Sequence, residues 1–220
     1  MSLAFGSAVH STIEHILKSK ALPDQVELKE MIKMELLKEG IVEGNELKKL
    51  SKDAEGAVKN WTENYYPHLA KEHVSERNLQ FYDSEFPGLL MHGKIDLTER
   101  FSDGAVSVTD FKTGSSKTKN IIEKLEHDRL SSSLRQLAMY SYLIAGAEKG
   151  QNVSISRLLF LETPKGDKNS FYETYIGAEQ IDMLKKDIAD YIYLLSSGEW
   201  IIEECRSNSY RKKTLPAGGC

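Results

Sequence analysis

The chain has 220 residues with 33 acidic and 29 basic side chains, which gives a formal net charge of −4 at pH 7. Its 40% of hydrophobic residues and its 5 prolines exclude a disordered chain and permit one domain with a sizeable core. The mild acidity does not indicate a nucleic-acid protein, so such a function would require basic residues that gather locally.

Neither a membrane span nor a secretory signal is evident in the sequence. No stretch approaches the roughly 18 uninterrupted apolar residues of a membrane-spanning helix. The start, MSLAFGSAVH, lacks a basic segment followed by an apolar one. The 2 cysteines, Cys205 and Cys220, are too few for a disulfide framework or a structural zinc site. We therefore expect a soluble protein of the cytoplasm.

The first third of the chain is predicted to be helical. Apolar residues recur every three or four positions, and this spacing indicates helices over residues 6–19, 24–40 and 45–67. Pro67 has no backbone N–H, so we expect it to end or kink the third helix.

Strands and helices alternate in the rest of the chain. Turn signals at Pro87-Gly88 and Asp103-Gly104 indicate a meander of three strands. The expected elements are strands over 79–82, 89–99 and 105–112, helices over 120–127 and 131–148, strands over 153–161 and 171–176 around a turn at 164–167, and a helix over 181–195 that Gly198 stops. This order predicts an α/β fold in which helices flank a central mixed β-sheet.

We expect a single domain over residues 1–220. Its parts would be a helical region over 1–72, a core over 73–198 that contains the sheet, and a basic tail over 199–220. Neither an internal repeat nor a low-complexity linker divides the sequence.

One predicted strand carries an acid and a base on the same face. Strand side chains alternate between two faces, so Asp110 and Lys112 point to one side at the end of residues 106–112. Asp96 lies on the preceding strand, and hairpin pairing would bring it within a few ångströms of Asp110. Two converging carboxylates repel each other unless a cation lies between them, and oxygen ligands suit Mg²⁺ or Mn²⁺.

These groups have the chemistry that metal-dependent hydrolysis of a phosphodiester needs. A bound metal ion polarises a phosphoryl oxygen, and a neighbouring lysine holds the phosphate. A D-x-K sequence by itself also occurs at ordinary solvated strand ends, so other parts of the chain must decide between the two interpretations.

Three short motifs occur in order around this strand. The first is F-G-S-A-V-H at 5–10, the second joins G-K-I-D at 93–96 to D-F-K-T-G at 110–114, and the third is Q-L-A-M-Y at 136–140. Together they resemble the G-x-x-x-H, G-x-x-D, D-x-K-T-G and Q-x-x-x-Y motifs of RecB-like members of the PD-(D/E)XK nuclease superfamily. The resemblance implies a restriction-endonuclease-like core.

The resemblance also implies a metal site. His10, Asp96 and Asp110 would be the ligands, with the main-chain carbonyl of Phe111 as a further one. Glu14, one helical turn after His10, would orient the histidine; an ordinary surface acid is the alternative at this position.

Catalytic roles are carried over in the same way. Lys112 would be the catalytic lysine beside Asp96 and Asp110. Gln136 and Tyr140, four residues apart on one helix face, would line the site and position the lysine or the DNA backbone. The alternative is that these two residues only pack their helix against the sheet.

The cysteines separate this chain from many of the proteins that it resembles. Many RecB-like nucleases hold an iron–sulfur cluster with four cysteines, one before the core and three near the C-terminus. This sequence has no cysteine before Cys205, and Cys220 is its last residue. We therefore expect no iron–sulfur cluster.

Basic residues follow the predicted catalytic strand. The loop over 114–119 combines hydroxyl side chains with lysines, which suits contacts to phosphates without reading of bases. Lys117, Lys119 and Arg135 are the predicted DNA-binding residues. A second basic cluster comprises Arg206, Arg211, Lys212 and Lys213 of the tail. Ordinary surface lysines remain the alternative for any one of these positions.

The predicted function is a Mg²⁺- or Mn²⁺-dependent deoxyribonuclease. We expect an exonuclease on DNA ends or single strands that works with a helicase domain or subunit in recombination or repair, without contact with a membrane. The start of the chain, almost inside the first motif, suggests a piece of a longer polypeptide. The alternatives are a non-catalytic DNA-binding or scaffold module on the same fold, and a nuclease of RNA or of branched DNA.

Overall fold

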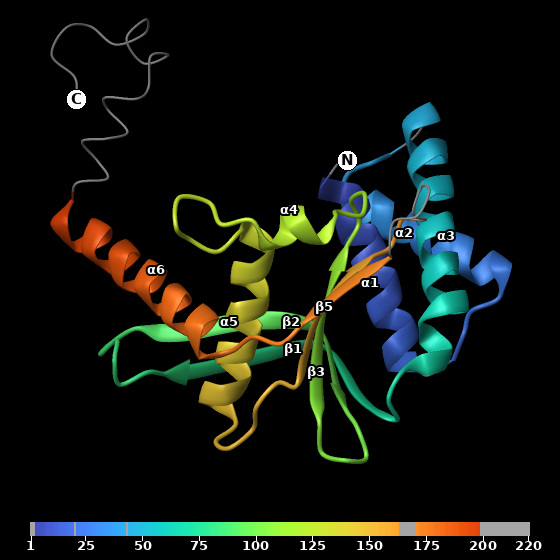
Figure 1. Ribbon diagram of the computed structural model, residues 1–220. Coiled ribbons are helices and arrows are strands. Elements are labelled where there is room, and N and C mark those ends of the chain that lie inside the picture. Colours follow the sequence, from blue (N-terminus) through green and yellow to red (C-terminus); the bar gives the residue numbers. More distant parts are fainter. Residues whose placement is uncertain (1–2, 20, 43, 163–169, 199–220) are drawn as a thin grey trace, which may run out of the picture.

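The computed structural model describes residues 3–19, 21–42, 44–162 and 170–198 and shows a five-stranded sheet between two layers of helices (Figure 1). The strands are β1 (Glu72–Tyr82), β2 (Leu90–Arg100), β3 (Val106–Lys112), β4 (Ile155–Phe160) and β5 (Phe171–Thr174). The helices are α1 (Leu3–Ser19), α2 (Gln25–Lys38), α3 (Asn45–Asn64), α4 (Lys119–Glu123), α5 (Ser132–Ala147) and α6 (Ala178–Ser197), and a 3-10 turn, η1 (Tyr66–His68), follows α3.

The strands lie side by side in their chain order. β1, β2 and β3 form an antiparallel meander, β4 is parallel to β3, and β5 is antiparallel to β4. Parallel neighbours need a crossover, which α4 and α5 provide between β3 and β4. The predicted α/β fold with a central mixed sheet and an N-terminal helical region is therefore confirmed. Within the described residues, no helix is long and apolar enough to span a bilayer.

Each face of the sheet has its own hydrophobic core. α1, α2 and α3 pack on one face, where the fully buried Trp61 lies edge-to-face with Phe111 of β3. α5 and α6 pack on the other face, where Leu137 and Leu143 share a core with Val108 (Figure 1). Complete burial of one leucine contributes roughly 2 kcal/mol. The strands are thus fixed from both sides, which also fixes the polar residues at their ends.

Two glycines of the sequence motifs allow helices to approach the sheet closely. A Cβ atom at Gly93 would lie 2.5 Å from Cδ1 of Leu143, so glycine is needed where α5 packs against β2. A Cβ atom at Gly6 would lie 3.2 Å from Oγ1 of Thr113, where α1 meets the chain that follows β3. These close contacts let α5 pack against β2 and α1 pack against the segment that follows β3.

The helix expected over 120–127 is wrong in its second half. α4 ends at Glu123, and His127 and Asp128 have left-handed backbone conformations with φ of 53° and 60°. The chain turns back on itself there and then enters α5, which Ser131 caps by accepting a hydrogen bond from the backbone N–H of Leu134. The apolar spacing of this segment is helical, but the turn with its left-handed residues ends the helix early.

Two other predicted boundaries also differ from the structure. The strand expected over 79–82 is longer, because the polar residues from Glu72 onward pair with β2 as well. The long helix expected to reach Pro67 ends at Asn64, and η1 contains the proline. The turn expected at 164–167, the basic tail and both cysteines lie outside the described residues.

Candidate active site and metal centre

The candidate site lies where β2 and β3 separate. Their pairing extends as far as Leu97 and Thr109, and the next position of this register would join Asp96 to Asp110. The ladder ends there, and Oδ2 of Asp96 instead accepts a hydrogen bond from the backbone N–H of Phe111, with an N···O distance of 2.8 Å. Both aspartates are buried, so two carboxyl groups lie at adjacent positions away from bulk water.

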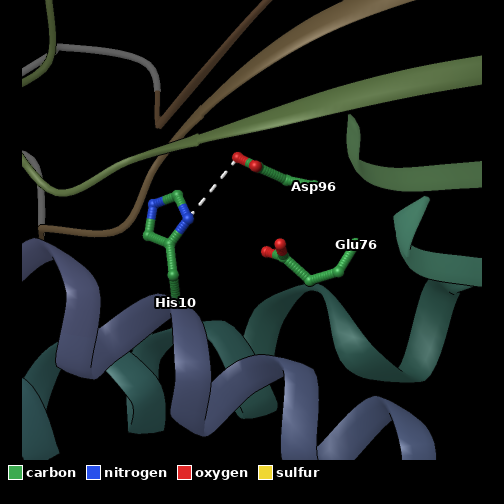
Figure 2. A group of neighbouring side chains, drawn as sticks. All are labelled: His10, Glu76 and Asp96. Carbon is green, nitrogen blue, oxygen red and sulfur yellow. Dashed lines mark ion pairs between the residues drawn. The ribbon is translucent and has the colours of Figure 1, made fainter. Parts of the chain in front are cut away.

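β1 contributes a third carboxyl group at an irregular point of the sheet. Glu76 lies across from Asp96 and has a left-handed φ of 51°, a conformation that costs a non-glycine residue about 1–3 kcal/mol. On β2, Ile95 packs in the core under α5, whereas Leu97 packs in the core under α1–α3. The alternation of faces is therefore interrupted at Asp96, and the carboxyl groups of Glu76 and Asp96 both point toward α1 (Figure 2).

α1 supplies a histidine to the same place (Figure 2). Nε2 of His10 lies 3.0 Å from the carbonyl oxygen of Phe111, and Nδ1 lies 3.6 Å from Oδ2 of Asp96. One ligand atom from each of His10, Glu76 and Asp96 lies within 4.8 Å of the other two. These three residues come from three different elements, so only the tertiary fold makes the group.

The chemistry of this group fits a divalent cation. Mg²⁺ and Mn²⁺ prefer carboxylate oxygens, and an imidazole is a common further ligand for transition metals. A cation would also relieve the repulsion between the carboxylates of Glu76 and Asp96. The predicted ligand set named His10, Asp96, Asp110 and the carbonyl of Phe111, and the structure adds Glu76 beside the first two.

Glu76 is the residue that sequence reasoning missed. The strand predicted over 79–82 left it in a connection, where an acid carries no signal. In the structure the hairpin around Pro87-Gly88 pairs Tyr82 with Leu90, and extension of this register puts Glu76 opposite Asp96. The sequence alone does not give this register, so it held no signal for Glu76.

A closed ring of three hydrogen bonds and one ion pair lies on the α5 side of the strand end. Nζ of Lys112 lies 2.6 Å from Oδ2 of Asp110 and donates to Oε1 of Gln136 at 2.6 Å. Nε2 of Gln136 donates to the Tyr140 hydroxyl at 3.0 Å, and this hydroxyl donates to Oδ1 of Asp110 at 3.1 Å. Each member is therefore held by two others, which fixes the position of the lysine ammonium group.

Burial dominates the electrostatics of the two aspartates. Burial and the nearby charge of Asp110 raise the pKa of Asp96 to about 6, against the opposing effects of His10 and the Phe111 N–H. Burial also raises the pKa of Asp110, although Lys112 opposes the shift. A cation near these carboxyl groups would favour their ionised forms, so the site is electrostatically suited to bind one.

The predicted DNA contacts lie apart from this cluster or have partners of their own. Lys117 is exposed, and Nζ of the exposed Lys119 lies 3.6 Å from Oε1 of Glu123. Nε of Arg135 lies 2.9 Å from Oδ2 of Asp187, an ion pair that joins α5 to α6. These contacts give Arg135 a structural role, and its contact with DNA remains a prediction.

Glu14 does not contact the histidine that it was predicted to orient. Among the described residues its carboxylate pairs with Lys18 on the next turn of α1. It does line the same cavity as His10, Glu76 and Asp96, so it adds negative charge to the site.

The fold and the motifs together define a class of protein, the nucleases that carry a D-x-K sequence at the end of a sheet strand. A family model described as the PD-(D/E)XK nuclease superfamily matches residues 1–215, and the chain belongs to that superfamily. Membership supports nuclease activity. The RecB-like subgroup is a finer assignment and remains a prediction.

Solved structures agree on the fold. A crystal structure of a candidate exonuclease from Eubacterium rectale matches with a TM-score of 0.50 and 13% sequence identity, over 78% of this chain. The match covers 64% of that structure's chain, and at this identity the likeness shows the fold alone. No curated protein matches the sequence significantly.

Proposed function

We propose that this protein is a divalent-metal-dependent deoxyribonuclease that uses Mg²⁺ or Mn²⁺. The observation that carries the proposal is the convergence of His10, Glu76 and Asp96 next to the ring that fixes Lys112. Superfamily membership supplies the reaction class, and the site supplies the groups that the reaction requires.

The two sides of the strand end would have different tasks. His10, Glu76 and Asp96 would hold the cation, with Asp110 and the carbonyl of Phe111 available as further oxygen ligands. A cation in this site would polarise a phosphoryl oxygen and increase the acidity of a water molecule beside the phosphate. The side chains of the protein would hold that phosphate in one orientation toward the water molecule.

Lys112 would stabilise the charge that develops on the phosphate. Its ammonium group is held in place by Asp110 and Gln136 before substrate binds, so the transition state requires little rearrangement. Burial and the charges of Asp110 and Asp96 raise the pKa of Tyr140 above its usual range. The phenol therefore keeps its proton and remains a hydrogen-bond donor to Asp110.

The finer assignments belong to the same proposal. We infer an exonuclease on DNA ends or single strands that acts with a helicase in recombination or repair, in the cytoplasm. The Eubacterium rectale protein's name is compatible with an exonuclease. Exposed Lys117 and Lys119 would contact phosphates of the DNA beyond the site.

A non-catalytic module on the same fold is the main alternative. The ring argues against it, because a binding module has no need of a partly exposed lysine that a buried carboxylate, Gln136 and Tyr140 hold in place. We therefore favour the enzyme.

Cleavage of labelled nucleic acids tests the proposal. Linear single-stranded DNA, linear duplex DNA, circular single-stranded DNA and RNA are incubated with the wild type and Asp110→Asn, in Mg²⁺, Mn²⁺ or EDTA. We expect cleavage of linear DNA with either metal, none in EDTA, and a loss of at least about 100-fold in the variant. Circular DNA should resist an exonuclease. Equal cleavage by the wild type, by the variant and in EDTA would overturn the proposal.

A further inference from the structure

Lys94 lies in the candidate metal centre without a role in the predicted mechanism. It precedes Asp96 by two residues on β2 and lines the cavity of about 720 Å³ into which the metal ligands open. Its side chain is 55% exposed, whereas the side chain of Glu76 beside it is 10% exposed. The lysine therefore sits at the mouth of the cavity, above a buried carboxylate.

The cavity is strongly acidic. The carboxyl groups that line it belong to Glu14, Glu39, Glu76 and Asp96. Among the described residues of this lining, Lys94 alone carries an ammonium or guanidinium group. A DNA phosphate that enters the cavity would be repelled by these carboxylates, so cations are needed to admit it.

Lys94 is bound to one of the metal-site carboxylates. Its Nζ forms an ion pair with Oε2 of Glu76, the residue with the left-handed backbone. The ammonium group thus compensates the charge that a divalent cation would compensate in the loaded site.

The ammonium group of Lys94 and a metal ion bound to Glu76 would compete for Oε2, the carboxylate oxygen that the lysine contacts. A divalent cation has twice the charge and binds oxygen ligands at shorter distances, so it would displace the ammonium group. Lys94 has a flexible four-carbon stem and an exposed end, and a released ammonium group would remain at the mouth of the cavity.

We propose that Lys94 is an internal counter-ion of the metal-free site, which a divalent cation displaces from Glu76 and which then binds a DNA phosphate. This inference rests on the proposed function, because it needs a metal ion at His10, Glu76 and Asp96. Lys94 would then lower the affinity of the site for the metal ion and raise the affinity of the loaded site for DNA.

Calorimetric titration with Mn²⁺ alone tests the competition. Lys94→Met keeps an unbranched side chain of similar length, without the terminal ammonium group, so it should tighten Mn²⁺ binding by about fivefold. In a Glu76→Gln background the same substitution should leave Mn²⁺ affinity unchanged, because the carboxylate for which the two cations compete is gone. Lys59→Met is the matched control, since Lys59 lies on α3 and pairs there with Glu63 at 3.7 Å.

The salt dependence of DNA binding tests the second half of the proposal. Binding of labelled single-stranded DNA is measured with Mn²⁺ or with EDTA. All variants carry Lys112→Met, which should slow cleavage enough for binding to be measured. With Mn²⁺, Lys94→Met should reduce the slope of log affinity against log salt by about one, the amount for one lost phosphate contact. In EDTA the slope should not change, because Glu76 holds the ammonium group. Lys94→Arg should restore the slope.

Two results would overturn the inference alone. If the wild type binds Mn²⁺ but Lys94→Met binds it equally well or more weakly, the lysine does not compete with the metal. If Lys94→Met changes the salt slope equally in Mn²⁺ and in EDTA, or in neither, the metal ion does not release Lys94 from Glu76. Failure of the wild type to bind Mn²⁺ would overturn both this inference and the proposed metal site.

Discussion

The two halves of the site differ in how their polar groups are satisfied. The α5 half comprises Asp110, Lys112, Gln136 and Tyr140, and the α1 half comprises His10, Glu76 and Asp96. Three hydrogen bonds and one ion pair close a ring among the members of the α5 half. The α1 half instead gathers ligand atoms around an acidic cavity, where Lys94 compensates one carboxylate. One half is therefore complete by itself, and the other is suited to a cation.

Because the two halves differ in this way, we expect single substitutions to separate metal binding from catalysis. Changes in the α1 half should act first on the metal, and changes of Lys112, Gln136 or Tyr140 in the α5 half should act on the chemical step.

Lys112→Met should lower the rate of DNA cleavage by about 100- to 1,000-fold while Mn²⁺ affinity falls by no more than about twofold. The ammonium group would act on the transition state, and the metal ligands His10 and Glu76 lie on the other side of the strand end. Single-turnover cleavage and calorimetry measure the two effects. Lys59→Met is the control, because Lys59 lies on α3 and pairs there with Glu63 at 3.7 Å. A variant that loses metal binding and cleavage in parallel would contradict the division.

Glu76→Gln should weaken Mn²⁺ binding by about tenfold, because it removes one negative ligand from a small set. Cleavage at saturating Mn²⁺ should recover most of the wild-type rate. Glu14→Gln makes the same chemical change in the same cavity and should leave Mn²⁺ affinity within about twofold, since Glu14 pairs with Lys18. Equal effects of the two substitutions would show that only the total charge of the cavity matters.

Tyr140→Phe should reduce the cleavage rate about three- to tenfold and the free energy of unfolding by about 1–2 kcal/mol. The hydroxyl joins Gln136 to Asp110 inside the protein, so its loss opens the ring and leaves a buried acceptor unpaired. Mn²⁺ binding should remain within about twofold of the wild type. Tyr175→Phe, at a residue 66% exposed, should change none of these quantities. An unchanged cleavage rate in Tyr140→Phe would leave the ring without a catalytic function.

The metal-free protein should become less stable as the pH rises from about 4 to about 6. Folding raises the pKa of Asp96 from 3.8 to about 6, so in this range the folded state binds a proton that the unfolded chain has lost. Asp110, whose pKa is also raised, acts in the same direction. The free energy of unfolding therefore falls with rising pH across this window.

Asp96→Asn should remove part of that fall and stabilise the metal-free protein at pH 8 by about 1–3 kcal/mol. Urea unfolding in EDTA at pH 5 and pH 8 measures the effect. Asp103→Asn, in an exposed turn, is the control. In saturating Mn²⁺ the sign should reverse, because the substitution removes a ligand of the folded state. A stability of the variant that equals the wild type at both pH values would contradict the burial argument.

Short-range periodicity in the sequence is enough to predict part of the site. Side chains alternate between the two faces along β3, so Asp110 and Lys112 share one face of the sheet. Residues four apart lie on one face of a helix, so Gln136 and Tyr140 share one face of α5. Hairpin register placed Asp96 beside Asp110. These relations hold within one element or across one turn, so they can be derived before any packing is known.

Only the tertiary structure decided which of these elements meet and where the sheet is irregular. Glu76 reaches the site because β1 is longer than its apolar residues suggest and because its backbone is left-handed at this residue. Lys94 and Glu76 are 18 positions apart on different strands, so only the register of β1 against β2 makes them a pair. Arg135 acquires its partner Asp187 when α6 packs against α5. Such contacts follow from register and packing between distant segments, which the local periodicity of a sequence does not encode.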